Sequence, residues 1–275
     1  MKGMRCLAIL ALLIGLFCWM STGALAVSIS VDGDVTDWGI DLNYAVDQGY
    51  LDNHLPSSPS ADVETEDNDA INSDKWVQVY PGWSYNNDYD AEAIYFDNDS
   101  LYGYVAIITG VSPSSTWPAG DIGFDVDMSE YATLYDQDGT GSAGDTPYEY
   151  GIKLSNKQLY KVSSWYSAHY DGDPSPDYAK DSDPWAIMDG TSLGGVDLVY
   201  SSCPNGHYVI ETKFLLSDLG LNPGDEFNIH WTMKCGNDFL TLKAKVDPVP
   251  EPGTILLVGT GLLGLALGSR KRKTK

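Results

Sequence analysis

The central part of this sequence lacks arginine and carries little positive charge of any kind. Residues 27–250 contain nine lysines and 38 acidic residues, so their formal net charge is 9 − 38 = −29. Contacts with phosphate backbones need a basic surface, and this charge therefore argues against nucleic acid as a partner. A body of one charge sign also repels other copies of itself, which favours solubility outside the cell.

Familiar catalytic motifs are missing as well. The chain has no Gly-x-Ser-x-Gly and no His-Glu-x-x-His, and its four histidines form no close pair in the sequence. These absences argue against a serine hydrolase triad and against a zinc protease site. Sugar hydrolysis would need two facing carboxylates, for which Glu92, Glu149 and Glu211 lie in or beside expected strands. We expect no catalytic residues, and we expect His230 on a solvent-exposed strand face.

Only the two ends of the chain are strongly apolar. Residues 1–26 combine a basic start with an apolar run at 6–20 and the small-x-small sequence Ala24-Leu25-Ala26. This order is typical of a secretory signal peptide that signal peptidase removes. We therefore expect a signal helix at 1–26 and an exported acidic domain at 27–247.

The second apolar run, residues 254–268, has a different setting. Pro250-Glu251-Pro252 precedes it and a basic cluster at 270–275 follows it. Fifteen residues are slightly few for a membrane span, and the positive-inside rule places the basic cluster in the cytoplasm. A simple tail anchor with a transmembrane helix is one interpretation. The three parts in this order also resemble the PEP-CTERM sorting signal of Gram-negative bacteria, here at residues 248–275.

The PEP-CTERM resemblance has consequences for processing and location. It implies that exosortase, a membrane-embedded protease resembling cysteine transpeptidases, reads Pro250, Glu251 and Pro252 as a recognition motif. It also implies a transient inner-membrane anchor through the C-terminal helix. The expected destination is the outer surface or the extracellular matrix of a bacterium that makes exopolysaccharide.

Cysteine is scarce in the acidic domain, which holds only Cys203 and Cys235. An even pair in an oxidising compartment most often forms a disulfide. Buried thiols and a metal site are the alternatives, although two cysteines make only a weak case for zinc.

The acidic domain has no long helical period but many short β-rich runs separated by Gly, Pro, Asn and Asp. Alternation is clear in three runs, so we expect one buried and one wet face, as in antiparallel sheets. The sequence predicts an all-β fold, an antiparallel two-sheet β-sandwich of jelly-roll or immunoglobulin-like kind. The expected strands are 28–31, 76–80, 91–96, 101–109, 121–127, 148–154, 158–165, 196–201, 207–214, 226–234 and 239–246.

Turn residues add detail to this expectation. Residues 97–100 predict a hairpin turn, and residues 217–220 predict one helical turn with Ser217 as its cap. Residues 49–74, 137–147 and 171–184 are polar and acidic, which predicts surface loops. Binding sites are often found on such loops.

Three short motifs carry a second resemblance, to family-9 carbohydrate-binding modules and related DOMON-like sandwiches. They are Val31-Asp32-Gly33-Asp34-Val35-Thr36-Asp37-Trp38, Asn98-Asp99-Ser100-Leu101-Tyr102, and residues 214–221 with Pro223-Gly224-Asp225. The family's pair of sugar-stacking tryptophans has no clear match, so sugar binding is not carried over. Some DOMON-like domains carry heme, which would need an axial His or Met inside the sandwich. We expect Met233 to face inward and His230 outward.

Two kinds of binding site remain as hypotheses. Calcium prefers oxygen ligands on flexible loops, and Asp136, Asp138, Asp171 and Asp173 are the candidate ligands. The cluster Asp32, Asp34 and Asp37 could also serve, although capping of turns by Asx side chains explains it equally well.

Aromatic residues near loops are the candidates for sugar binding. Trp83, Trp117 and Trp185 could stack on the apolar faces of sugar rings, whereas Trp231 fits a buried position. We therefore expect a non-catalytic surface or matrix protein that is adhesive or binds extracellular polysaccharide. The alternatives are a secreted glycoside hydrolase-like enzyme and, less favoured, a heme or redox carrier.

Overall fold

The computed structural model describes residues 29–40, 42, 61–65, 91–128, 148–168, 183–203, 207–236, 238–248 and 261. All but the last lie in the compact unit Val27–Pro248. The predicted signal helix, strand 76–80 and C-terminal helix lie outside these ranges, except for Gly261. Within the described ranges, no helix has the length and apolar character needed to cross a membrane.

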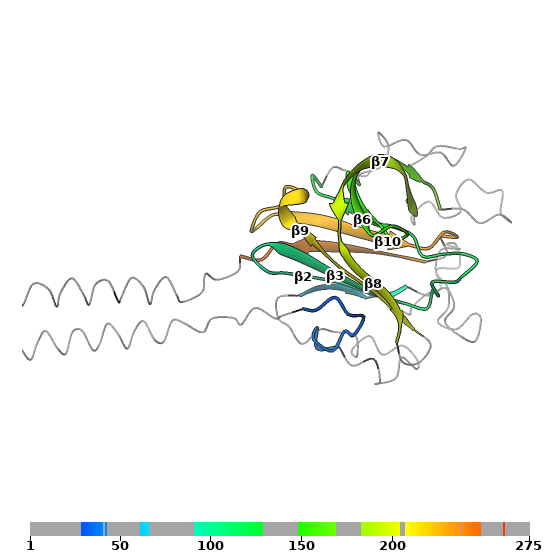
Figure 1. Ribbon diagram of the computed structural model, residues 1–275, viewed down its shortest axis with the longest axis horizontal. Helices are drawn as coiled ribbons and strands as arrows, with labels where there is room; N and C mark the ends of the chain where they lie inside the picture. Colours follow the sequence, from blue (N-terminus) through cyan, green and yellow to red (C-terminus); the bar gives the residue numbers. More distant parts are fainter. Residues whose placement is uncertain are drawn as a thin grey trace, which may run out of the picture. The chain divides into compact units, whose positions relative to one another are not determined.

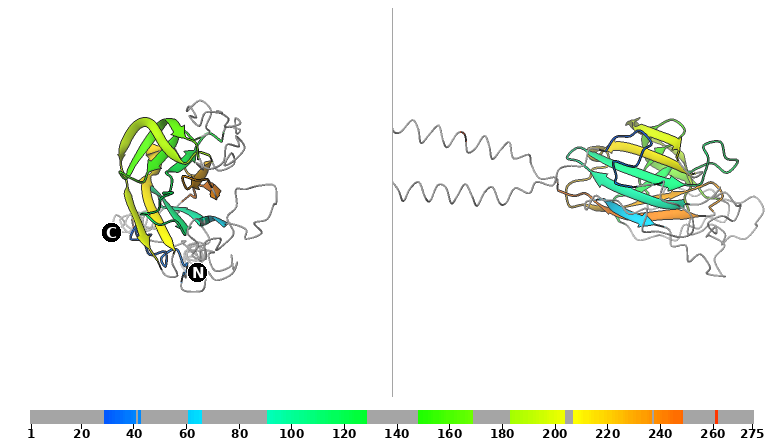
Figure 2. Two further views of the ribbon diagram at one scale, coloured as in Figure 1. Left: turned by 90° about the vertical axis from the view of Figure 1, so that its right-hand side faces the viewer. Right: turned by 90° about the horizontal axis from the view of Figure 1, so that it is seen from below.

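Two antiparallel sheets form the domain, and this confirms the predicted all-β sandwich (Figures 1 and 2). The first sheet has the order β1-β2-β3-β9-β8 and the second has the order β11-β10-β4-β5-β6-β7. The strands of the first sheet are β1 (Asp62–Thr65), β2 (Ala91–Asn98), β3 (Tyr102–Thr109), β9 (Tyr208–Leu215) and β8 (Asp197–Ser202). Those of the second are β11 (Phe239–Lys245), β10 (Glu226–Thr232), β4 (Ile122–Asp125), β5 (Tyr150–Lys153), β6 (Gln158–Tyr166) and β7 (Ala186–Gly195).

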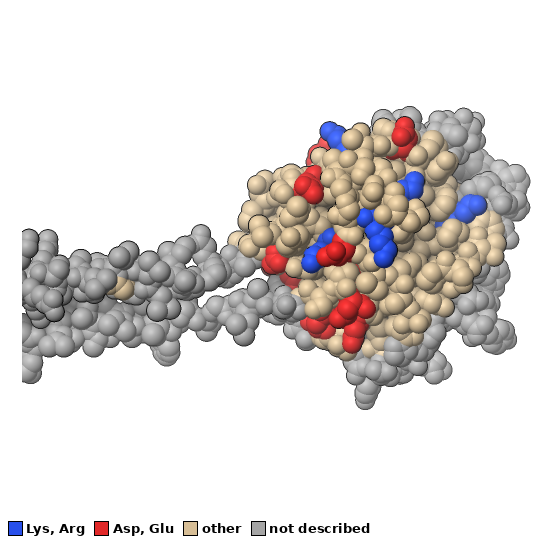
Figure 3. All heavy atoms as spheres, in the orientation of Figure 1, with Lys and Arg blue, Asp and Glu red and all other residues tan. Residues whose placement is uncertain are grey.

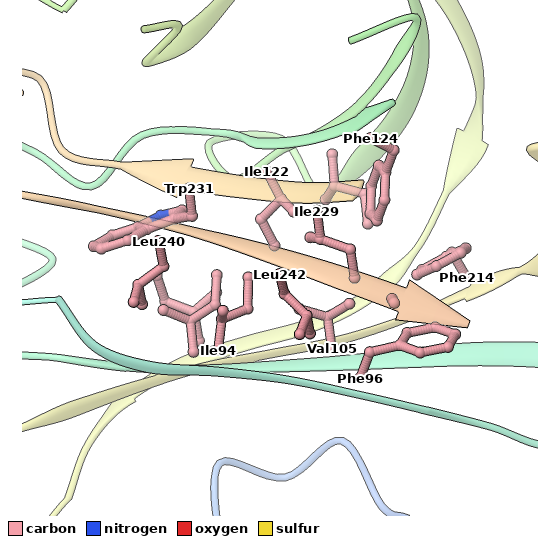
Figure 4. Packing of buried hydrophobic residues seen from close by; sticks show 14 of the residues in the cluster. Ile94, Phe96, Val105, Ile122, Phe124, Phe214, Ile229, Trp231, Leu240 and Leu242 are labelled. Atoms are coloured by element: carbon pink, nitrogen blue, oxygen red, sulfur yellow. The ribbon is translucent and has the colours of Figure 1, made fainter. Parts of the chain in front are cut away.

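The hydrophobic core lies between the two sheets and follows the alternation in the sequence. Figure 4 shows Ile229, Trp231 and Leu242 of the second sheet pointing toward Ile94 and Val105 of the first. The inward positions of β11 are buried, while the outward Lys243 and Lys245 are exposed, as predicted. Met233 is buried in this core, also as predicted.

The hairpin turn between β2 and β3 is confirmed as well. Asp99 is its organising residue, because its Oδ1 accepts hydrogen bonds from the backbone N–H groups of Leu101 and Tyr102, both at 2.7 Å. The predicted helical turn is a 3-10 helix, Leu216–Asp218, and Gly220 ends it with φ of 74°. No side chain caps this helix, so the prediction of Ser217 as its cap is wrong.

The outer face of the first sheet is covered, which corrects the prediction of a wet face there. The described part of the segment 29–42, residues 29–40 and 42, runs across this face (Figure 1, blue). Residues 29–31 of the predicted strand 28–31 form no strand there. The apolar side chains of this segment, including Trp38 and Ile40, join Tyr95 and Ile108 of the sheet in a second apolar cluster. Val209 and Glu211 of β9 are therefore buried rather than solvated.

The outer face of the second sheet is also partly covered, here by the sheet itself. Strands β6 and β7 form a curled hairpin, which the views of Figures 1 and 2 show as an arch. Trp165 and Ile187 of this hairpin pack with Tyr148 in a third apolar cluster. His230 stacks on the Tyr148 ring with centroids 5.1 Å apart and is 1% exposed, so the prediction of a surface histidine is wrong.

Two strands were not predicted. β1 lies inside the expected loop 49–74, and β7 covers a polar, glycine-rich stretch with no apolar alternation. Both are edge strands, where side chains meet solvent on more than one side and the sequence pattern is weak.

Candidate functional sites

A fully buried carboxylate attaches residues 29–42 to the first sheet. Glu211 accepts hydrogen bonds from Asp32 N at 3.0 Å, from Gly33 N at 2.9 Å and from Trp38 Nε1 at 2.9 Å. Burial raises the pKa of Glu211, and these three donors partly oppose that shift. Both carboxylate oxygens of Glu211 therefore accept hydrogen bonds from residues 29–42.

The cluster Asp32, Asp34 and Asp37 caps the local turns. Asp32 Oδ1 accepts from Asp34 N at 2.9 Å, and Asp34 Oδ1 accepts from Thr36 N at 3.0 Å. Asp37 Oδ2 accepts from Ser30 N at 2.7 Å. These contacts are the Asx capping that the sequence offered as the alternative to calcium.

Glu92, the second carboxylate candidate, pairs with His207. Their Oε1 and Nε2 atoms lie 2.8 Å apart, and the His207 side chain is 1% exposed. The backbone N–H of Cys203 donates to the carbonyl of His207, so the cysteine lies on the adjoining turn.

The predicted disulfide between Cys203 and Cys235 is absent, because both residues are thiols. They pack in different apolar clusters: Cys203 lies beside the one under residues 29–42, and Cys235 lies in the main core. Burial raises the pKa of the Cys203 thiol to about 11. A thiol with that pKa is a poor nucleophile at neutral pH.

Glu149, the third candidate, belongs to a group of three carboxylates that the sequence did not single out. Glu149 and Asp127 come together with the buried Asp125, and each offers one oxygen within 4.8 Å of the others. Val126 N donates to Glu149 Oε2 at 3.0 Å, and Asn228 Nδ2 donates to Asp125 Oδ2 at 3.0 Å. Burial, and then the charges of Asp127 and Asp125, raise the pKa of Glu149.

Three oxygen donors at this spacing could hold a hard divalent cation such as calcium. Asp125 and Asp127 come from the end of β4, and Glu149 precedes β5, its sheet neighbour. Sheet pairing rather than sequence spacing brings them together. The predicted calcium ligands Asp136, Asp138, Asp171 and Asp173 lie outside the described residues, so calcium binding there stays a prediction.

An aromatic pair lies at the end of the β6–β7 hairpin where β6 ends and β7 begins. The rings of Tyr166 and Trp185 have centroids 6.3 Å apart and an interplanar angle of 34°. Trp185 N donates to the Tyr166 carbonyl at 3.0 Å, which holds the two residues side by side. Tyr166 is 44% exposed and Trp185 is half-buried, so both rings are accessible to solvent.

A partly buried acid supports this aromatic pair. Asp183 Oδ1 accepts a short hydrogen bond from Ala168 N, which fastens the chain next to Tyr166 to the chain next to Trp185. Burial raises the pKa of Asp183 to about 7, against the hydrogen bonds from Ala168 and Ser167. The carboxyl therefore changes its charge near neutral pH.

Trp117, another predicted sugar-stacking residue, has a different environment. It is half-buried against the main core, and Lys234 Nζ lies over its ring, 5.4 Å from the centroid. The short segment after Trp117 leads to Asp121, whose N–H donates to the Trp185 carbonyl at 2.7 Å. Trp117 and Trp185 thus flank one segment, while Trp83 lies outside the described residues.

Sequence reasoning missed Tyr166 and the carboxylate group of β4 and β5. Tyr166 follows a run that ends in Ser163-Ser164-Trp165, and its strand bulges there, so alternation gives no sign of its orientation. The only signal for the carboxylates was the Asp-x-Asp spacing at 125 and 127.

The comparisons with known proteins bear on the C-terminal segment. No curated protein matches the chain. Residues 248–273 match the family model described as the PEP-CTERM protein-sorting motif, which confirms the prediction made from Pro250, Glu251, Pro252 and the segments that follow. This motif indicates an exported surface protein that exosortase sorts.

Proposed function

We propose that the sandwich is a non-catalytic domain that binds extracellular polysaccharide at the cell surface or in the matrix. The observation that carries the proposal is the Tyr166–Trp185 pair. Two neighbouring, solvent-accessible rings offer flat apolar surfaces to the C–H faces of sugars, and each ring also carries a polar group that can hydrogen-bond. Export by exosortase would bring this pair into contact with surface glycans.

The surroundings of the carboxylates support a non-catalytic role. Glu211 is buried beneath residues 29–42, and Glu92 pairs with His207. A glycosidase needs one acid and one base that face each other across a sugar-binding cleft. Of the three candidates from the sequence, Glu149 remains for such a role, and its carboxylate lies within 4.8 Å of those of Asp125 and Asp127.

The test is retention of the full chain, purified in a mild non-ionic detergent, on immobilised bacterial exopolysaccharides. Tyr166→Ala and Trp185→Ala should each weaken retention about tenfold, because stacking of one aromatic ring contributes roughly 1–2 kcal/mol. Tyr102→Ala is the matched control, since this half-buried tyrosine contacts Lys213 on the first sheet.

Two results would contradict the proposal. Equal retention of Trp185→Ala and the unchanged chain would show that the pair binds no glycan. Release of new reducing ends from the polysaccharide by the unchanged chain, lost in Glu149→Gln, would make the domain a glycosidase instead.

A further inference from the structure

The lysines of the described ranges differ in their surroundings. Lys213 pairs with Asp197 at 2.9 Å, and Lys243 pairs with Glu226 at 2.7 Å. Lys245 lies beside Asp62, and Lys234 lies over the Trp117 ring. Lys153 donates to the Ile187 carbonyl at 2.8 Å and lies near the buried Asp121.

The two remaining lysines, Lys157 and Lys161, are exposed and form no ion pair with another described residue. They lie in the stretch 150–168, which contains three of the nine lysines of residues 27–250 and no acid. The described acids of the same hairpin are Asp183, which precedes β7, and Asp189 of β7, whose Oδ1 accepts from Gly190 N. The stretch 150–168 itself is therefore locally positive within a body of charge −29.

The visible face carries charges of both signs. Figure 3 shows a group of acidic side chains at its lower edge. Basic side chains lie in its middle and upper parts, where further acidic side chains lie among them. Screening limits the reach of the acidic groups to about 8 Å at physiological salt, so a local basic surface can attract an anion.

Lys157 occupies its position at a conformational cost. Its φ is 55°, in the left-handed region that glycine or asparagine adopts more easily. The backbone is held there by two hydrogen bonds: Lys157 N donates to the Lys153 carbonyl at 2.9 Å, and Val196 N donates to the Lys157 carbonyl at 3.0 Å. Glycine would adopt this backbone conformation at lower cost, so the turn itself does not require a lysine.

Polar side chains suited to sugar hydroxyls lie beside these lysines. Asn156 Nδ2 donates to Tyr160 Oη at 2.8 Å, Tyr160 Oη donates to Gln158 Oε1 at 3.3 Å, and Ser192 Oγ donates to the same Gln158 oxygen at 2.8 Å. The network joins the β5–β6 turn to β7. It fixes amide and hydroxyl groups at the surface of the hairpin whose other end carries Tyr166 and Trp185.

From these observations we infer that the β6–β7 hairpin binds an anionic polysaccharide, with carboxylate groups of the glycan held by Lys157 and Lys161. The inference rests on the proposed function, because the aromatic pair supplies the stacking surface for the same glycan. Acidic sugars such as uronic acids carry both features that the hairpin would recognise: ring C–H faces and a carboxylate.

The test compares two forms of one polymer, polygalacturonate and its fully methyl-esterified form, which differ only in charge. The full chain in detergent, with EDTA to prevent calcium bridging, should be retained more strongly by the acid than by the ester. The double variant Lys157→Gln/Lys161→Gln should bind the acid about tenfold more weakly and the ester unchanged. Lys243→Gln/Lys245→Gln removes the same charge elsewhere and should retain full binding.

Lys157→Gly separates binding from folding. Glycine relieves the left-handed backbone and removes the charge, so the melting temperature should rise while retention on polygalacturonate falls. A fall in both the melting temperature and the retention would mean that Lys157 stabilises the fold rather than binding the glycan, which would overturn the inference.

Three other results would also overturn it, and they differ in what they mean for the proposed function. If the chain bound the acidic and the esterified polymer equally, and Trp185→Ala lost binding to both, the domain would bind neutral glycans. The lysines would then have no role in binding. Retention on neither polymer would contradict both proposals for this glycan class. A change in oligomeric state of the lysine double variant, with unchanged glycan retention, would assign the hairpin to contacts between copies of the chain.

Discussion

The two outer faces of the sandwich are covered by different segments, although a buried carboxylate that accepts hydrogen bonds attaches each segment. On the first sheet, residues 29–42 arrive from a distant part of the sequence and are held by Glu211. On the second sheet, the curled β6–β7 hairpin is held by Asp121, whose oxygens accept from Ile187 N at 2.8 Å and Leu154 N at 2.9 Å. Each buried carboxylate thus accepts a hydrogen bond from at least one backbone N–H of the segment that covers it, and Asp121 accepts a second one from Leu154 in the turn between β5 and β6.

The two covers differ in the side chains that they present to solvent, which suggests that they differ in function. The segment on the first sheet adds large apolar side chains to a closed cluster and carries acids on its outside. The hairpin on the second sheet leaves exposed lysines, polar groups and an aromatic pair around its cluster. We therefore expect the first cover to contribute more to stability and the second to carry recognition.

The largest effect is expected at Glu211. Glu211→Ala leaves two backbone N–H groups and the Trp38 indole without their acceptor, so the free energy of unfolding should fall by about 4 kcal/mol. Urea denaturation followed by tryptophan fluorescence measures the change.

Glu211→Gln retains one carbonyl acceptor and should lose about 1 kcal/mol only. If Glu211→Ala and Glu211→Gln lowered the free energy of unfolding equally, the hydrogen bonds of Glu211 would not be what attaches residues 29–42. In that case the two covers would not both be attached by hydrogen bonds to a buried carboxylate.

A smaller effect, dependent on pH, is expected at Asp121. Burial raises its pKa to about 6 from an ordinary value of 3.8, so the folded state holds the proton more tightly than the unfolded state. Its contribution to stability is complete below about pH 4 and is lost as the pH rises through 6, a change of up to roughly 3 kcal/mol. Asp121→Asn should make the decline of stability between pH 4 and pH 7 less steep, while the part that comes from Asp183, whose pKa is also raised, remains.

The control for Asp121 is the same substitution at an acid with the opposite shift. The exposed Glu226 has a pKa lowered by its hydrogen bond to Lys243, so Glu226→Gln should leave the decline unchanged. If Asp121→Asn showed the full decline, the pH dependence would belong to the general repulsion of the acidic body.

Much of the fold could be predicted because burial between two sheets leaves an alternating pattern. Phe227, Ile229 and Trp231 illustrate it, and the turn at Asp99 marks a hairpin by its own side chain. The covers could not be predicted, since they depend on contacts such as that between Gly33 and Glu211, which are 178 residues apart. A polar residue such as His230 therefore looked solvated in the sequence.

The candidate sites were less predictable than the core. The Trp185 side chain was singled out correctly as lying near the surface, but its partner Tyr166 is fixed only by pairing across the β6–β7 hairpin. The disulfide prediction failed because an even number of cysteines carries no information about distance. The sorting motif was predictable in full, because its parts are contiguous.

Amide hydrogen exchange of the full chain, with and without polygalacturonate, tests the central claim most directly. The account predicts slower exchange in β6 and β7 upon binding, with no change in residues 29–42 on the first sheet. Protection confined to residues 29–42, or no protection on either cover while the polymer is bound, would contradict it.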